Sequence, residues 1–377
     1  MSGQLREAVL THVAIWSDLS VPVLNFDVYL TGYDVQTINL RDVIVFGNLP
    51  QTAPAGQDPD DSISPKGQLS QDIEVRNCAG KLPPTPLPAS FLTHVRSVLT
   101  GRPSPMLGNL CAGQSFRDNI ARGYITVDTV SRCTPRFPGD PGYFPPGRHD
   151  VTDQNLLWGA WYIVDAAQNH AHGSNLVAIE ADGADPATST PGRYTFYGRY
   201  NGWSATDHRE PLATTFATQY AAEGPFDAGT DLIVWRDRKA DQEPFTCPSM
   251  PEDPTAWAQL KERVLIFDEK EHAVDPSANP CPIGICPGGT EHRPFPAATQ
   301  RVHVGAYSYP SLPVPFFFGW FYLDLNAEVA TAAGSPPADP KAAQAWVVAT
   351  MSSHGHFAVA VDAYRLDSAC AANHAVP

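Results

Sequence analysis

Apolar and polar residues alternate with a period of two along much of this chain, a pattern that predicts β-strands. In the segment 23–30, Leu24 and Phe26 fall on one face while Asn25 and Asp27 fall on the other, which predicts a half-buried strand. Comparable runs predict strands over residues 124–130, 176–179, 193–200, 212–220, 231–237, 264–269, 301–304, 316–325 and 357–366.

These runs are rich in β-branched and aromatic residues, and many of the 37 prolines and 28 glycines lie between them. The combination predicts an all-β fold, an antiparallel β-sandwich with a few short helices and long Pro/Gly-rich loops. The run 316–325 is apolar on both faces, which predicts a central strand buried between layers and assigns its aromatic residues to the core.

Three helices are expected. Ser90 is positioned to cap a helix over about 90–100 that Gly101 ends. Asp339-Pro340 predicts the start of a second helix that includes Trp346 and Val347, because proline is tolerated in the first helical turn. A third, short helix is expected after Asp253-Pro254.

Segments 51–67, 81–88 and 274–296 are rich in proline and glycine and predict long loops. The first two suggest a boundary near residue 100. Residues 1–100 then form an N-terminal β segment with the helix near its end, either separate or packed into the main body, and residues 101–377 form the main sandwich domain.

Composition narrows the class of protein. Hydrophobic residues make up 43% of the chain and aromatic residues 10%, which excludes intrinsic disorder. No apolar run is long enough for a transmembrane helix. Lys and Arg number 25 against 40 Asp and Glu, and the net charge of −15 argues against nucleic acid as a partner.

The seven cysteines favour an oxidising compartment, and hence an extracellular or cell-surface location. Cys281 and Cys286 lie close enough to close a local disulfide, with free thiols or a metal as the alternatives. The first seven residues contain no apolar segment of a signal peptide, so export is inferred from composition, and a reduced intracellular protein is the alternative.

Three phrases, at residues 25–37, 121–128 and 230–237, resemble a family of uncharacterised, exported, β-rich bacterial proteins. They read NFDVYLTGYDVQT, ARGYITVD and TDLIVWRD. The resemblance implies a secreted or surface β protein, and it implies no known activity and no catalytic residues.

Two His-x-His units, His170/His172 and His354/His356, are candidate transition-metal ligands, because residues i and i+2 of a strand point the same way. A further ligand could come from His208, His303 or Asp362. Such a metal would serve a hydrolase or an oxidoreductase. The alternative is that these histidines are ordinary surface residues. In addition, His170 and His172 lie in a polar stretch that could form a turn as readily as a strand.

Acidic residues gather at Glu180, Asp182 and Asp185, and again at Asp58, Asp60 and Asp61. Oxygen-rich turns suit calcium, although neither group has EF-hand spacing, and a solvated loop explains both equally simply.

Trp203 follows the turn signal Asn201-Gly202 and precedes a charged run, so it is a candidate recognition residue. The candidate ligand-binding set is Trp203, Asp207, His208, Arg209 and Glu210.

No nucleophile elbow, phosphate-binding loop or zinc-protease motif is present. The sequence therefore favours a noncatalytic secreted or cell-surface protein that binds a ligand or glycan, adheres to a surface partner, or assembles with itself. The alternatives are a secreted metal-dependent enzyme that uses the His-x-His pairs, and a metal-free serine hydrolase with Ser352 or Ser353 beside His354.

Overall fold

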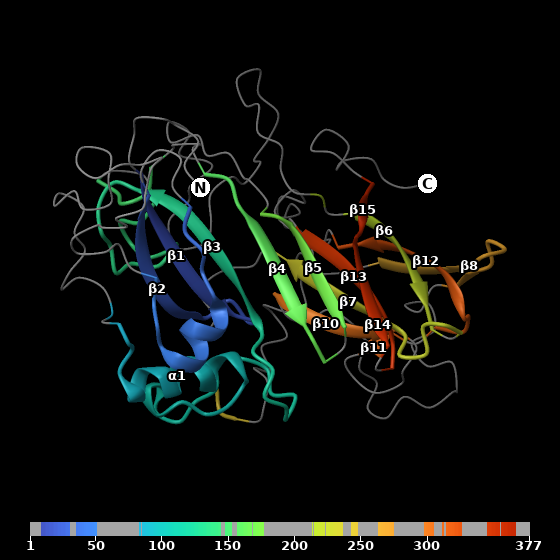
Figure 1. The fold of residues 1–377 in the computed structure, drawn as a ribbon, viewed down its shortest axis with the longest axis horizontal. Helices are drawn as coiled ribbons and strands as arrows, with labels where there is room; N and C mark the ends of the chain where they lie inside the picture. Colours follow the sequence, from blue (N-terminus) through green and yellow to red (C-terminus); the bar gives the residue numbers. More distant parts are fainter. Residues whose placement is uncertain are drawn as a thin grey trace, which may run out of the picture. The chain divides into compact units, whose positions relative to one another are not determined.

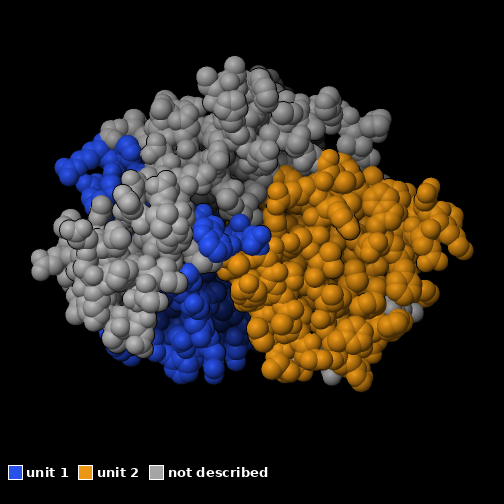
Figure 2. Space-filling view, turned by 45° about the horizontal axis from the view of Figure 1, so that its top comes forward, with its two compact units in different colours: residues 1–159, 175–198, 238–252 blue, residues 160–174, 199–237, 253–377 orange. Residues whose placement is uncertain are grey.

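The computed structural model of the protein describes residues 9–30, 35–50, 83, 85–144, 148–152, 157–167, 169–176, 213, 215–222, 224–236, 243–247, 263–274, 298–304, 311–312, 314–325, 345–354 and 356–366 (Figure 1). The chain divides into two compact units, which Figure 2 colours separately. The first comprises residues 1–159, 175–198 and 238–252, and the second comprises residues 160–174, 199–237 and 253–377.

The first unit contains a three-stranded antiparallel sheet in the order β2-β1-β3. Its strands are β1 (Val9–Ser17), β2 (Pro22–Leu30) and β3 (Gly123–Val130). Because β3 follows residue 100 in the chain and pairs with β1, residue 100 lies within the first unit.

Strand β2 forms where the alternation predicts it, but the expectation that it is half-buried is wrong. Asn25 and Asp27 are buried together with the apolar face. Their polar groups are satisfied by a loop that follows β3: Asn25 donates to the Pro135 carbonyl oxygen at 2.8 Å, and Asp27 accepts from the Thr134 backbone N–H at 3.0 Å. Hydrogen bonding of this kind is what makes the burial of polar side chains tolerable.

Helix α1 (Ala89–Leu99) confirms the helix expected near residues 90–100 and contacts β1 and β2. Its N-cap is Pro88 rather than Ser90, so the predicted cap is wrong; the Pro88 carbonyl oxygen accepts the first helical bond, from the Leu92 N–H. Gly101, just beyond the end, has φ +64°, and an added Cβ would lie 2.1 Å from the Gln114 carbonyl oxygen. The unit also contains π-helix η1 (Asp42–Phe46) and 3₁₀-helix η3 (Pro105–Leu107).

The second unit is built on two five-stranded sheets, with orders β11-β10-β7-β13-β14 and β15-β6-β12-β8-β9. All pairings within them are antiparallel except β10 with β11. The first sheet contains β7 (Thr230–Arg236), β10 (Thr299–Val304), β11 (Ser311–Leu312), β13 (Ala345–Ser353) and β14 (Phe357–Asp362). The second contains β6 (Thr215–Ala221), β8 (Arg263–Asp268), β9 (Ala273–Val274), β12 (Phe318–Asp324) and β15 (Tyr364–Arg365).

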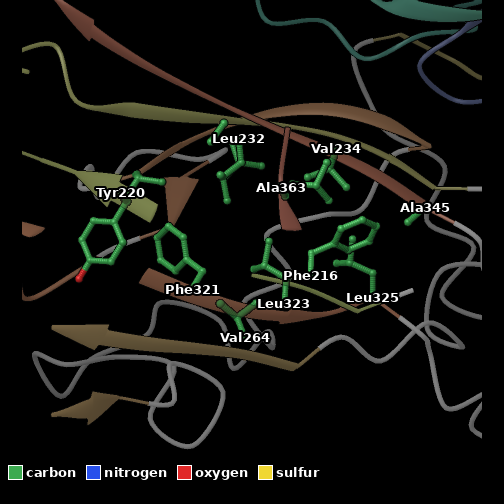
Figure 3. Close-up of a cluster of buried hydrophobic side chains, with 14 of the residues drawn as sticks. Phe216, Tyr220, Leu232, Val234, Val264, Phe321, Leu323, Leu325, Ala345 and Ala363 are labelled. Carbon is green, nitrogen blue, oxygen red and sulfur yellow. The ribbon is translucent and has the colours of Figure 1, made fainter. Parts of the chain in front are cut away.

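One buried cluster joins the two sheets into a sandwich, as the sequence predicts. Leu232 and Val234 of β7 pack with Phe216 of β6 and with Phe321 and Leu323 of β12 (Figure 3). A separate two-stranded sheet pairs β4 (Ala160–Asp165) with β5 (His170–Asn175) and leaves Tyr162 and Val164 exposed.

Two further expectations need correction. The predicted helix after Asp339-Pro340 does not include Trp346 and Val347, because these residues form β13 and pair with β7. Strand β12 is central in its sheet, as expected, but it is buried on one face only: Phe321 is fully buried, whereas Phe318 is 40% exposed. Phe317, which precedes the strand, is 60% exposed.

Cys111 and Cys247 form a disulfide within the first unit. Cys133 is also disulfide-bonded. None of the helices in the described part of the chain is long and apolar enough to cross a membrane.

Candidate functional site

One end of the sandwich in the second unit is hollowed by a cavity of about 320 Å³. Strand register places it there: Thr230, which begins β7, lies opposite Val304 of β10 and Met351 of β13. The Thr230 hydroxyl accepts from the Ala221 N–H and donates to the Ala221 carbonyl oxygen, which links the two sheets at this end. The cavity is therefore lined by loops and strand ends that are distant from one another in the sequence.

Asp227 is the fixed carboxylate of the cavity wall. Its Oδ1 accepts from the His354 backbone N–H at 2.8 Å and from the Ser353 hydroxyl at 3.0 Å. The backbone bond from His354 is the main reason that the pKa of Asp227 lies below its usual range. The side chain is 56% exposed, so an oriented and ionised carboxylate faces solvent.

His303 is held by a second carboxylate. It lies opposite Asp231 in the β10–β7 register, and its Nδ1 is 3.1 Å from Asp231 Oδ1, while Arg301 bonds Oδ2. Burial raises the pKa of Asp231, but the bonds from His303 and Arg301 outweigh it and the net pKa is lowered. With Nδ1–H directed at the Asp231 carboxylate, neutral His303 keeps Nε2 as an acceptor.

Gly229 makes room for the His303 ring. It has φ +75°, and an added Cβ would lie 3.1 Å from His303 Cε1 and 3.4 Å from Nε2. The Gly229 N–H bonds the Phe226 carbonyl oxygen, and its own carbonyl accepts from the Ser352 N–H, so both sides of the turn are fixed. Both the backbone conformation and the space favour glycine here.

Apolar and aromatic groups complete the wall. Phe316 packs against the buried core, whereas Phe317 is exposed and lines the same cavity as Asp227, His303 and His354. An exposed ring in the same cavity as oriented hydrogen-bonding groups offers an apolar surface and polar partners to a ligand.

The same geometry does not support the serine-hydrolase alternative. A nucleophilic serine gives its proton to an imidazole. Here Ser353 is buried and its hydroxyl donates to Asp227, while the His354 Nδ1 lies 3.5 Å from the same carboxylate. The carboxylate therefore occupies the position that the histidine holds in a triad.

The His-x-His units lie in different settings. His170 and His172 are in strand β5 and share its partly buried face, so the strand interpretation of that pair is confirmed. The His172 Nε2 lies 3.9 Å from Asp362 Oδ1, whereas His354 faces Asp227 in the cavity described above. His356 lies in the turn before β14, where its carbonyl oxygen accepts from Asn169.

Across the residues that the structure describes, no three histidine, cysteine or carboxylate side chains are grouped closely enough to hold an ion. The shared metal site remains a prediction, and it has no geometric support in this part of the chain.

Several predicted site residues lie outside the described residues, and the hypotheses on them stay predictions. These are Trp203, Asp207, His208, Arg209, Glu210, Glu180, Asp182, Asp185, Asp58, Asp60, Asp61, Cys281 and Cys286.

Sequence reasoning missed Asp227, Asp231 and Phe317 as site residues. Asp231 and His303 are each typical of a polar strand position, and only the β7–β10 register pairs them. Phe317 was assigned to the core because its neighbours are apolar. A turn signal was present for Asp227, which lies between Gly224-Pro225 and Gly229.

Comparison with protein-family models, with curated proteins and with solved structures finds no significant match to this chain. Its function must therefore be argued from its own residues.

Proposed function

We propose that this protein is a noncatalytic, exported or surface-located β-sandwich protein that binds a glycan in the cavity of the second unit. The observation that carries the proposal is the exposed Phe317 ring beside the fixed carboxylate of Asp227. A sugar offers an apolar C–H face to the ring and hydroxyl groups to the carboxylate.

The polar groups suit a neutral sugar. The carboxylate of Asp227 accepts hydrogen bonds from hydroxyl groups, and the imidazoles of His303 and His354 accept or donate according to their protonation. Because Asp227 is held by Ser353 and by the His354 N–H, little side-chain entropy is lost on binding. Export is inferred from the cysteine content and is consistent with the disulfides.

A glycan array probed with the full, disulfide-intact chain tests the proposal. Phe317→Ala should lower affinity for the best glycan about tenfold, because one stacked ring contributes on the order of 1 kcal/mol. Phe318→Ala is the matched control, since this ring is adjacent in sequence, also partly exposed, and does not line the cavity.

Asp227→Asn should weaken binding without a large change in melting temperature, because the amide oxygen can still accept from the His354 N–H. Absence of any glycan binding, or equal losses in Phe317→Ala and Phe318→Ala, would refute the proposal.

A further inference from the structure

A cationic cavity lies in the first unit, in residues that the proposed glycan site does not use. It has a volume of about 450 Å³, and its charged lining residues are Arg132, Arg136, Arg148 and Asp150. Three guanidinium groups face one carboxylate, so the lining carries a local charge of about +2 in a chain whose net charge is −15.

Asp150 lies beneath the arginines. Its side chain is fully buried, Arg132 bonds Oδ1, and Oδ2 accepts from Arg136 Nη1 and from the Thr134 hydroxyl, each at 2.7 Å. Burial raises the pKa of Asp150, but the bonds from Thr134, Arg136 and Arg132 outweigh it and hold the pKa below its usual range. The buried carboxylate therefore orients two guanidinium groups and neutralises only one of the three positive charges.

The arginines retain donors for a ligand. A guanidinium has five N–H groups, and Arg136 uses only Nη1 for Asp150. Arg148 is exposed and makes no hydrogen bond or ion pair with the rest of the described chain. The side chains of Arg132 and Arg136 are 35% and 43% exposed, so their outer edges are accessible.

The wall of this cavity is anchored to the sheet of the first unit. The Thr134 N–H donates to buried Asp27 and the Pro135 carbonyl accepts from buried Asn25, both on β2. Cys133 adds a disulfide to the same wall. Anchoring of this kind lowers the entropy lost when a ligand binds.

We infer that this cavity is a binding site for a doubly charged tetrahedral oxyanion, such as free sulfate or the terminal group of a phosphate monoester. Arginine forks match the edges of a tetrahedral oxyanion with paired N–H···O bonds, and a charge of −2 balances the lining. The inference does not depend on the glycan proposal, because it concerns other residues in the other unit.

Calorimetric titration of the full chain with sodium sulfate and with sodium phosphate, each at an ionic strength held constant with chloride, tests the inference. Saturable binding of at least one anion at one site is expected. Measurements at pH 5.5 and 7.5 distinguish the sources: sulfate stays doubly charged at both, whereas phosphate gains its second charge between them. The anion that binds more tightly at pH 7.5, where both are largely doubly charged, identifies the source. Phosphate binding should weaken at pH 5.5 because the second charge is lost, whereas sulfate binding should not change.

Arg148→Gln should weaken binding about tenfold, the effect of losing one charge-assisted hydrogen bond. Arg102→Gln is the matched control, since this exposed arginine of the same unit bonds Asn119 and does not line the cavity. Since Arg148 has no partner in the described chain, its substitution should leave the melting temperature unchanged.

Three results would overturn the inference: no saturable binding of either anion, equal weakening in Arg148→Gln and Arg102→Gln, or acetate binding as tightly as sulfate. A rise in melting temperature with sulfate in the wild type, reduced in Arg148→Gln, would support it independently of the calorimetric signal.

Discussion

His12 and Asp27 face each other across β1 and β2, and the imidazole Nδ1 lies 2.5 Å from the carboxylate Oδ1 with both side chains fully buried. Asp128 flanks His12 on the opposite strand, β3, and accepts from the Tyr143 hydroxyl at 2.7 Å. A polar row thus crosses the sheet of the first unit inside its core.

Asp27→Ala should destabilise the protein by about 3–5 kcal/mol, because it leaves His12 buried without its carboxylate and removes the acceptor for the Thr134 N–H. Urea denaturation measures the loss. Asn25→Ala removes the other tether of the same loop without touching the His12–Asp27 pair, and its effect should be smaller, about 1 kcal/mol. Equal effects of the two substitutions would contradict this account of the pair.

Asp18 should make the protein more stable at mildly acidic pH. Burial raises its pKa to about 7, well above the 3.8 of an exposed aspartate. Between pH 3.8 and pH 7 Asp18 is protonated in the folded protein but ionised in the unfolded chain, so proton binding favours the folded state. This stabilisation is fully present below the unfolded pKa and is lost as the pH rises through 7. Asp18 alone should therefore make the free energy of unfolding about 2–3 kcal/mol larger at pH 5 than at pH 8.

Asp18→Asn isolates this contribution. The amide oxygen can still accept from the Gln114 N–H but does not titrate. In this variant the free energy of unfolding should differ less between pH 5 and pH 8. The difference that remains is expected from Asp128, because burial raises its pKa to about 6. A variant with the full difference would show that Asp18 is not its source.

Gly229→Ala should disturb the cavity of the second unit through His303. Alanine at φ +75° costs about 1–2 kcal/mol of backbone strain. Its Cβ would also lie 3.1 Å from the His303 ring, which must move to make room. Gly224→Ala is matched in φ, but its Cβ would meet Phe318 instead. The NMR signal of the His303 ring should move in the first variant only, while both lose similar stability.

The Cys111–Cys247 disulfide should contribute substantially to the stability of the first unit. It closes a separation of 136 residues, for which chain entropy gives an upper value of about 5 kcal/mol. The double variant Cys111→Ser/Cys247→Ser should melt at a lower temperature by differential scanning calorimetry. An unchanged melting temperature would mean that the unfolded chain is constrained in some other way.

The sandwich was predictable where a strand alternates by itself, as β10 does with Val302 and Val304 on one face and Arg301 and His303 on the other. Strand β1 was missed because it is buried at every position, and its polar residues are acceptable only through tertiary partners such as Asp27 for His12. Strand β13 was misread because a Pro-based helix signal precedes it, whereas pairing with β7 decides its structure.

The candidate site was less predictable than the fold. The sequence points to His303 and His354 as metal ligands. In the structure His354 bonds Asp227, in the turn before β7, and His303 bonds Asp231, in β7 itself. Strand register brings these groups together, and register between strands distant in sequence cannot be read from local periodicity.

Asp227, Phe317 and His354 line the cavity of the second unit but do not belong to the buried cluster that joins its sheets. If the cavity binds a glycan as proposed, substitutions there alter ligand preference without removing contacts of that buried cluster. Under that proposal, ligand preference is adjusted at these three positions independently of the β architecture.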